Sequence, residues 1–345
     1  MNPTSTSQAA SSPALGPSLE PELPKARGPL SQRLLRVLSA APSAIDLGAV
    51  AVPSDPLSDD DLHLALYLCY ELHYRSFKGV DPHWEWNPHL IAYRSKLEQI
   101  FESALTEAFF DQKESGSVVD EVKRISESSQ GPSLARYIGE SATLEQFREF
   151  VIHRSAYQLK EADPHSWVIP RLDGKPKAAL IEIQIDEYGG GQLDRMHCEL
   201  FRKTMTGLGL DGRYGAYLDL IPGATLATVN LISLFGLHRR LRGAAVGHLT
   251  IFEMTSSQPN RFYAEGARRL GASAEVTEFY DEHVEADSVH EVIAAHDLAG
   301  GLAAEEAELA PWVRFGARAC AGLDGRFSSY VLERWARGES SLLQP

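Results

Sequence analysis

The chain has 345 residues, of which 43% are hydrophobic, enough to fill a substantial core. Its formal net charge of -14 disfavours a nucleic-acid partner, because such a partner usually requires a basic surface that neutralises phosphates. The three cysteines, Cys69, Cys198 and Cys320, lie far apart and form no CxxC pair, which excludes the usual patterns of a disulfide framework or a thiolate zinc site.

The N-terminal part of the sequence predicts a tail followed by a compact domain. Residues 1–28 are rich in Pro, Ser, Ala and Thr and nearly lack large apolar side chains, so burial cannot repay the entropy of ordering them and a disordered tail is expected. A short amphipathic helix is expected over residues 30–39, within an irregular segment at 29–56, and the domain itself over 57–340. There is no signal peptide pattern and no stretch of about 20 apolar residues, which predicts a soluble, cytoplasmic protein without a membrane partner.

Apolar residues at helical spacing predict a series of helices from residue 58 onward. Ser58 and the three aspartates that follow it offer side chains that can cap the first long helix, and a second helix is expected over 88–110. A third begins at Thr143 and ends at Pro164, which places Glu161 in its last turn and His165 at the surface. No sustained alternation of apolar and polar residues is visible, so the predicted fold class is all-α. Further helices are expected over 177–187, 192–207, 225–234, 239–255, 261–270 and 274–295.

The last of these helices carries His283, Asp287 and His290 at positions i, i+4 and i+7. Helix residues with these spacings differ by only about 40° and 20° around the axis, so two imidazoles and a carboxylate would project together. Nitrogen and oxygen donors without thiolate suit iron, manganese or zinc. The surrounding acidic residues leave another interpretation open, since charge runs usually form solvated surface.

Three stretches of the chain together resemble the haem-oxygenase-like di-iron oxidases and oxygenases, a family also described as iron-containing redox enzymes. The stretches are residues 160–165, residues 182–191 with Met196 and His197, and residues 282–291. The resemblance implies an all-α, haem-oxygenase-like helical bundle that binds two Fe(2+) ions per chain and uses dioxygen as co-substrate. It also implies six metal ligands, which correspond here to Glu161, Glu187, His197, His283, Asp287 and His290.

The spacing of Glu187 and His197 requires a bend in the chain between them. Ten residues along a straight helix span roughly 15 Å, which is too far for one metal cluster. The three glycines at 189–191 lie between the two residues and are expected to supply the bend. A lone His such as His197 between apolar residues is more often a core residue than a ligand, but the combined set favours metal binding.

Two more residues are predicted to take part in catalysis. Tyr188 adjoins a predicted ligand and could donate a hydrogen bond to a metal-bound oxygen species, although tyrosines beside glycine turns are also ordinary packing residues. Glu253 lies among apolar residues, where a carboxylate needs a partner. It is predicted either to accept a hydrogen bond from a ligand histidine or to pair with an arginine.

The resemblance implies a non-haem di-iron oxidoreductase, a monooxygenase or oxidase, acting on a small organic molecule such as an amine, amino acid or fatty acid derivative. An electron donor or reductase and a homodimer are left open as partners. Two alternatives are kept. One is a haem-binding or haem-degrading enzyme of the same fold, with His63 or His73 as the proximal ligand. The other is a non-enzymatic helical interaction protein whose histidines and glutamates are merely polar surface.

Overall fold

The structure is a computed structural model that describes residues 20–111, 116–128 and 133–344, without the side chains of residues 286–289. All regular elements in these ranges are helical, which confirms the all-α prediction. Residues 1–19 of the predicted tail lie outside the described ranges. Residues 20–28 contain no regular element but are ordered against the rest of the chain, for example by the hydrogen bond from the Lys25 N–H to Asp219 Oδ1 at 2.7 Å, so the prediction of disorder is wrong for them. The α-helices are α1 (Pro29–Leu38), α2 (Asp60–Glu71), α3 (Pro88–Phe109), α4 (Val118–Glu127), α5 (Leu134–Glu140), α6 (Leu144–Gln158), α7 (Asp163–Ser166), α8 (Gly174–Glu187), α9 (His197–Gly207), α10 (Gly223–Leu237), α11 (Arg242–Met254), α12 (Ser257–Arg269), α13 (Ala274–Val292), α14 (Gly300–Glu305) and α15 (Ala310–Ala336).

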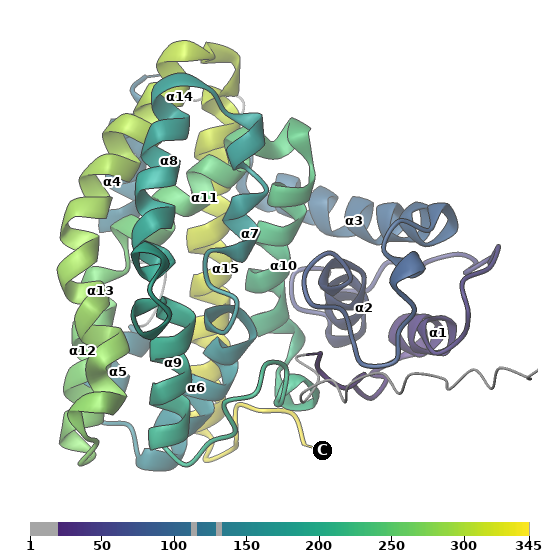
Figure 1. Ribbon diagram of the computed structural model, residues 1–345, viewed down its shortest axis with the longest axis horizontal. Helices are drawn as coiled ribbons and strands as arrows, with labels where there is room; N and C mark the ends of the chain where they lie inside the picture. Colours follow the sequence, from purple (N-terminus) through teal and green to yellow (C-terminus); the bar gives the residue numbers. More distant parts are fainter. Residues whose placement is uncertain (1–19, 112–115, 129–132, 345) are drawn as a thin grey trace, which may run out of the picture.

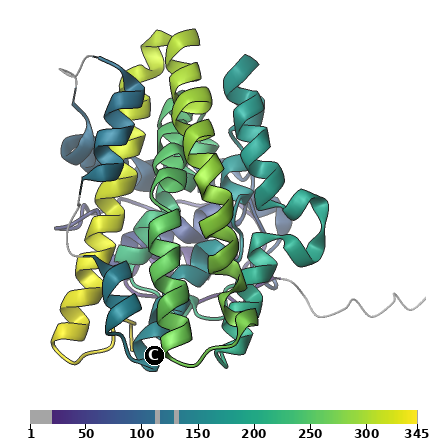
Figure 2. The same cartoon turned by 90° about the vertical axis from the view of Figure 1, so that its left-hand side faces the viewer.

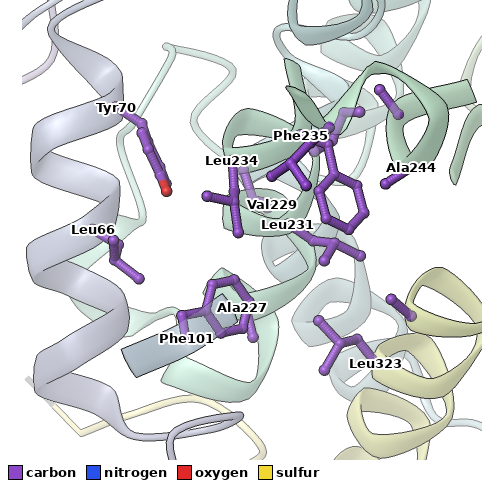
Figure 3. Close-up of a cluster of buried hydrophobic side chains, with 14 of the residues drawn as sticks. Leu66, Tyr70, Phe101, Ala227, Val229, Leu231, Leu234, Phe235, Ala244 and Leu323 are labelled. Carbon is purple, nitrogen blue, oxygen red and sulfur yellow. The ribbon is translucent and has the colours of Figure 1, made fainter. Parts of the chain in front are cut away.

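The first three helices form an N-terminal lobe beside a tall bundle made by the others (Figure 1). Helix α10 joins the two parts, because it packs on α2 on one side and on α15 and α11 on the other. Figure 3 shows Leu66 and Tyr70 of α2 facing Leu234 of α10, with Leu323 of α15 beyond it. These side chains are buried. Their removal from water, at about 25 cal/mol per Å² of apolar surface, stabilises the contact between lobe and bundle.

Local capping determines where several helices begin. The Asp59 carboxylate accepts a hydrogen bond from the backbone N–H of Leu62 at 2.7 Å and starts α2. Asn87 caps α3 in the same way, at the predicted position.

Buried leucines of α1 and of the segment after it, including Leu34 and Leu47, belong to the same apolar core as α2 and α10. The domain boundary at residue 57 stays a prediction.

Helix α6 ends at Gln158, so the prediction that Glu161 lies in its last turn is wrong. The chain turns there instead, and Ala162 takes a φ of 71°, in the left-handed region that non-glycine residues rarely adopt. Helix α7 begins at the next residue. His165 in α7 is buried rather than exposed, because this turn sends α7 back into the bundle, where α7 packs on α10.

The three glycines end α8 and supply the predicted bend. All three have positive φ, and two short 3-10 turns (Gly189–Gly191 and Leu193–Arg195) lead into α9. A Cβ atom on Gly189 would lie 2.5 Å from the carbonyl carbon of Arg195, so this position requires glycine. Helix α9 therefore starts at His197 rather than at residue 192.

Helix α13 packs on α9, α11 and α12 and continues into a π-helical segment (Ile293–Ala299) that packs on α8. In Figure 2 the lime-green α13 runs between the yellow α15 and the teal α8. This arrangement brings α13 alongside the ends of α8 and α9, where the predicted ligands lie.

None of the described helices combines the length and apolar character that crossing a bilayer would require.

Candidate metal centre

Four of the six predicted ligands converge in the bundle. Each offers one ligand atom, and these atoms all lie within 4.8 Å of one another. Their side chains come from the turn after α6, the last residue of α8, the first residue of α9 and the middle of α13, and all are buried. We call this set the first ligand group; its members are Glu161, Glu187, His197 and His283.

A second ligand group shares a residue with the first. Its members, Glu187, Glu253 and His290, also place one ligand atom each within 4.8 Å of one another, and all are buried. Glu187 belongs to both groups and therefore joins them. Two neighbouring groups joined by a carboxylate are the arrangement that a two-metal site requires.

Hydrogen bonds orient two of the imidazoles. His283 Nδ1 donates to the carbonyl oxygen of Phe279 at 2.7 Å, which turns Nε2 toward Glu161 Oε1, 3.7 Å away. His290 Nε2 donates to Asp186 Oδ2 at 3.0 Å, while Nδ1 lies 3.3 Å from Glu253 Oε2. Such contacts on the outer nitrogen fix the tautomer and the ring orientation of a ligand histidine. The inner nitrogens therefore face the carboxylates of the two groups.

The buried carboxylate oxygens of Glu161 fit a cation. Both are buried, and neither accepts a hydrogen bond from any described residue. A buried carboxylate normally pairs or coordinates a metal, because burial without compensation costs several kcal/mol. His197 Nδ1 lies 2.9 Å from Glu187 Oε2, with neither atom in hydrogen-bond geometry. Carboxylate and imidazole donors without thiolate suit iron, manganese or zinc.

Protons balance the carboxylate charges in the metal-free protein. Burial alone would raise the pKa of Glu187, but the adjacent His197 and His283 lower it to about 2. Burial opposes protonation of His290, yet the adjacent Glu253 carboxylate, 3.3 Å from Nδ1, raises its pKa to about 9. The carboxylate of Glu187 likewise raises the pKa of His197 against the effect of burial. A bound cation would replace these protons.

The remaining predicted site residues have different positions. Asp287 lies on α13 between the two ligand histidines, but its side chain is outside the described part, so its role as a ligand stays a prediction. The Tyr188 hydroxyl donates to Asp163 Oδ1 at 2.8 Å and lies 3.1 Å from Ser166 Oγ. It belongs to neither ligand group, and its catalytic role also stays a prediction. Glu253 lies beside His290, where it could accept a hydrogen bond from this predicted ligand, and it also offers a ligand atom to the second ligand group.

Sequence reasoning missed Asp186, the hydrogen-bond acceptor of His290. Its side chain is largely exposed, so no burial pattern distinguishes it. The available signal was its position directly before Glu187. Sequence reasoning also missed the buried pair of His165 and His248, whose Nε2 and Nδ1 atoms lie 3.5 Å apart. Burial lowers the pKa of His165 to about 4, so this pair is neutral at pH 7.

The contacts of His63 and His73 disfavour haem ligation. His63 Nε2 lies 3.0 Å from the carbonyl oxygen of Pro56, and Nδ1 lies 3.2 Å from Asn230 Nδ2. His73 Nδ1 is 3.2 Å from Glu85 Oε1, and Nε2 is 2.6 Å from Arg94 Nη1. Since both nitrogens of each ring already contact a polar atom, neither ring presents a nitrogen that could serve as an axial ligand of haem iron.

The alternative in which the histidines of α13 form solvated surface also meets a contrary observation. His283 and His290 are 3% and 1% exposed. The acidic residues beside them, such as Glu285 and Glu291, are exposed. The helix therefore turns its charge run to solvent and its histidines inward.

A cavity of about 360 Å³ lies next to the centre, a size typical of small-molecule sites. Phe279 lines it, and the Phe279 ring centroid lies 4.3 Å from that of His283 and 6.4 Å from that of His197. One aromatic ring thus separates the cavity from two imidazoles of the first ligand group. Arg154 and Asp324, both in the lining, form an ion pair of 3.1 Å.

Comparison with known proteins yields one family. A family model described as iron-containing redox enzyme matches residues 148–325, just over half of the chain. The matched segment contains every member of both ligand groups and excludes the N-terminal lobe. No curated protein matches the chain.

Proposed function

We propose, from the premise that this chain belongs to the iron-containing redox enzyme family, that it binds two iron ions and uses dioxygen to oxidise a small organic molecule. Family membership supplies the iron and the redox chemistry. The observation that supports two ions is the pair of buried ligand groups that share Glu187. The same buried groups argue against a protein whose histidines and glutamates are only surface.

The first ligand group would hold one ion, and the second group, with Asp287 as its predicted further member, would hold the other. Three carboxylates from the described residues offset most of the charge of two divalent ions, and the few protein ligands leave coordination positions for dioxygen. When bound, the ferrous ions supply the electrons that reduce dioxygen. An external electron donor or reductase would restore them between turnovers.

The residues of the chain prepare the site before the reaction. Asp186 and the Phe279 carbonyl hold His290 and His283 in one orientation each, so the ligand nitrogens need no reorganisation. Burial of both ligand groups excludes bulk water, which protects reactive oxygen species from side reactions.

The cavity beside Phe279 is the best candidate for the substrate site. Its lining is rich in apolar side chains, and the two opposite charges there neutralise each other in the Arg154–Asp324 pair. His248, which also lines the cavity, is neutral at pH 7, because burial holds its pKa well below the usual value. This chemistry favours a small, largely apolar substrate with no net charge to compensate.

The test is an anaerobic Fe(2+) titration followed by rapid mixing with dioxygen, monitored by visible absorption. Wild type and the control Glu291→Gln, whose residue is exposed on α13 and lies outside both ligand groups, should bind two irons per chain and give a transient band. His283→Ala, which deletes a first-group ligand, should lose both the stoichiometry and the band. No stoichiometric iron in wild type would refute the proposal, and a Soret band from bound haem would favour the haem-binding alternative.

A further inference from the structure

A buried ion pair links the turn that carries Glu161 to the N-terminal lobe. Lys160 Nζ lies 2.9 Å from Glu71 Oε2, and the two side chains are 1% and 0% exposed. Glu71 is the last residue of α2 and therefore lies outside the segment that matches the family. The Tyr214 hydroxyl donates to the same Glu71 oxygen at 2.7 Å. Glu71 thus connects the lobe, the Glu161 turn and the loop after α9.

Aromatic rings enclose the Lys160 ammonium. Nζ lies 4.3 Å from the ring centroid of Tyr74 and 4.9 Å from that of Tyr67, within the range of cation–π attraction. Burial of two opposite charges costs desolvation energy that only good geometry and further hydrogen bonds repay. A pair of this kind adds little net stability, but it tolerates only one arrangement of its neighbours. It therefore restrains the backbone at Lys160.

Arg75, which follows α2, restrains the other side of the same turn. Its Nη2 donates to the carbonyl oxygen of Leu159 at 3.1 Å and lies 3.8 Å from Asp163 Oδ2. From the bundle side, Gln184 Nε2 donates to the carbonyl oxygen of Ala162 at 3.0 Å. The left-handed conformation of Ala162 is unfavourable for a non-glycine residue, so the surrounding contacts must hold it in place.

These contacts matter for Glu161, because its carboxylate has no hydrogen bond of its own from the described residues. His283 Nε2, 3.7 Å from Glu161 Oε1, is too far for a hydrogen bond, so the backbone of the turn determines where the carboxylate points. We propose that the N-terminal lobe completes the metal centre: Lys160, Glu71 and Arg75 position Glu161 and so set the affinity of the first ligand group for its ion. The inference rests on the metal centre proposed above. None of the three residues belongs to a ligand group, so they are positioning residues.

The experiment compares two buried ion pairs. Lys160→Met and the double variant Lys160→Met/Glu71→Gln are titrated anaerobically with Co(2+), whose visible spectrum reports coordination geometry, and are unfolded thermally. The matched controls, Arg94→Met and Arg94→Met/Glu98→Gln, alter a buried pair of 3.2 Å in α3, outside both ligand groups. Arg75→Gln removes another contact that restrains the Glu161 turn. Because Arg75 is partly exposed, this variant should fold even if Lys160→Met does not.

Lys160→Met should weaken the tighter Co(2+) site by 10–100-fold and shift its visible bands, as expected when the support of a ligand is lost. The double variant should regain part of the thermal stability, because no buried charge is left unpaired, but not the affinity. The Arg94 variants should lose stability and keep the wild-type affinity and spectrum.

The inference is overturned if Lys160→Met and Arg75→Gln retain the wild-type affinity and spectrum, or if the Arg94 controls lose affinity equally. Failure of the wild type to bind Co(2+) would instead refute the metal centre itself, so the two failures can be told apart.

Discussion

Replacing Glu253 by Gln tests whether its carboxylate binds the second ion or only accepts a hydrogen bond. Glu253 Oε2 lies 3.3 Å from His290 Nδ1, while the other nitrogen of that ring donates to Asp186. The raised pKa of about 9 means that His290 carries both ring protons at pH 7 in the metal-free protein. The Glu253 carboxylate therefore attracts positive charge to the Nδ1 side of the ring, whether a proton or a cation. Glutamine keeps the shape of the side chain but removes the negative charge that attracts a proton or a cation.

The size of the effect follows from the number of ligands. A four-ligand site worth about 12 kcal/mol gains about 3 kcal/mol from each ligand, which corresponds to roughly 100-fold in affinity. The second ligand group has three described members, so Glu253→Gln leaves two of them. We expect the second ion to bind roughly 100-fold more weakly. The first ion should be little affected, because its four ligands remain.

The assay is an anaerobic Fe(2+) titration against a competing chelator, read as tight ions per chain. Wild type should bind two, and Glu253→Gln should bind one at micromolar free iron. Asp186→Asn, which removes only the acceptor of His290 Nε2, should weaken the second ion by 10–100-fold. Glu182→Gln, at an exposed position on the same helix as Asp186, serves as the control and should match wild type. Two ions with unchanged affinities in Glu253→Gln would show that its carboxylate is no ligand and refute the reasoning.

Two further predictions concern the stability of the fold around the centre. Gly189→Ala places a Cβ 2.5 Å from the Arg195 backbone at a φ of +59° and should lower the free energy of unfolding by more than about 2 kcal/mol. The control Gly190→Ala, whose Cβ meets nothing within 4 Å, should lower it by about 1 kcal/mol. Equal losses in denaturant unfolding would contradict the steric argument. Burial lowers the pKa of His63 to about 4 and of His153 to about 3, so below the unfolded pKa of about 6.5 only the unfolded chain takes up these protons. The free energy of unfolding should therefore decrease as the pH is lowered, by about 1.6 kcal/mol per histidine between pH 6.5 and 5. The wild-type loss should exceed that of His153→Gln by about this amount, and parallel pH profiles would argue against it.

The parts of the site that could be predicted from sequence follow from local geometry. The helical period alone places His283 and His290 on one face, and a glycine run alone indicates a bend before His197. The apolar pattern also predicts a helix over residues 88–110, and the structure starts α3 at Pro88, behind an Asn87 cap. Local pattern predicts a helix that continues to Pro164 and includes Glu161. The break after Gln158 depends on contacts with Arg75, which follows α2, and with Gln184 of α8, which no local pattern reveals.

The contacts that could not be predicted join residues far apart in the chain. The apolar neighbours of Glu253 predict that its carboxylate has a partner, but its place beside both Glu187 and His290 depends on how α8, α11 and α13 pack. The same holds for the pair of Lys160 and Glu71, which are 89 positions apart. A lysine or glutamate is common in any sequence, and only its burial in the folded protein shows that it needs a charged partner.

The backbone itself favours cations at this centre. Glu187 is the last residue of α8, Glu253 is the last but one of α11, and Glu161 follows the end of α6 by three residues. A helix C-terminus carries about half a negative elementary charge, so three such ends converge where three carboxylates already lie. The first residue of α9, His197, brings one positive helix end, which opposes them only in part. The neighbouring carboxylates raise the pKa values of His197 and His290 although burial opposes protonation of both rings. Two divalent ions would satisfy side chains and helix ends together.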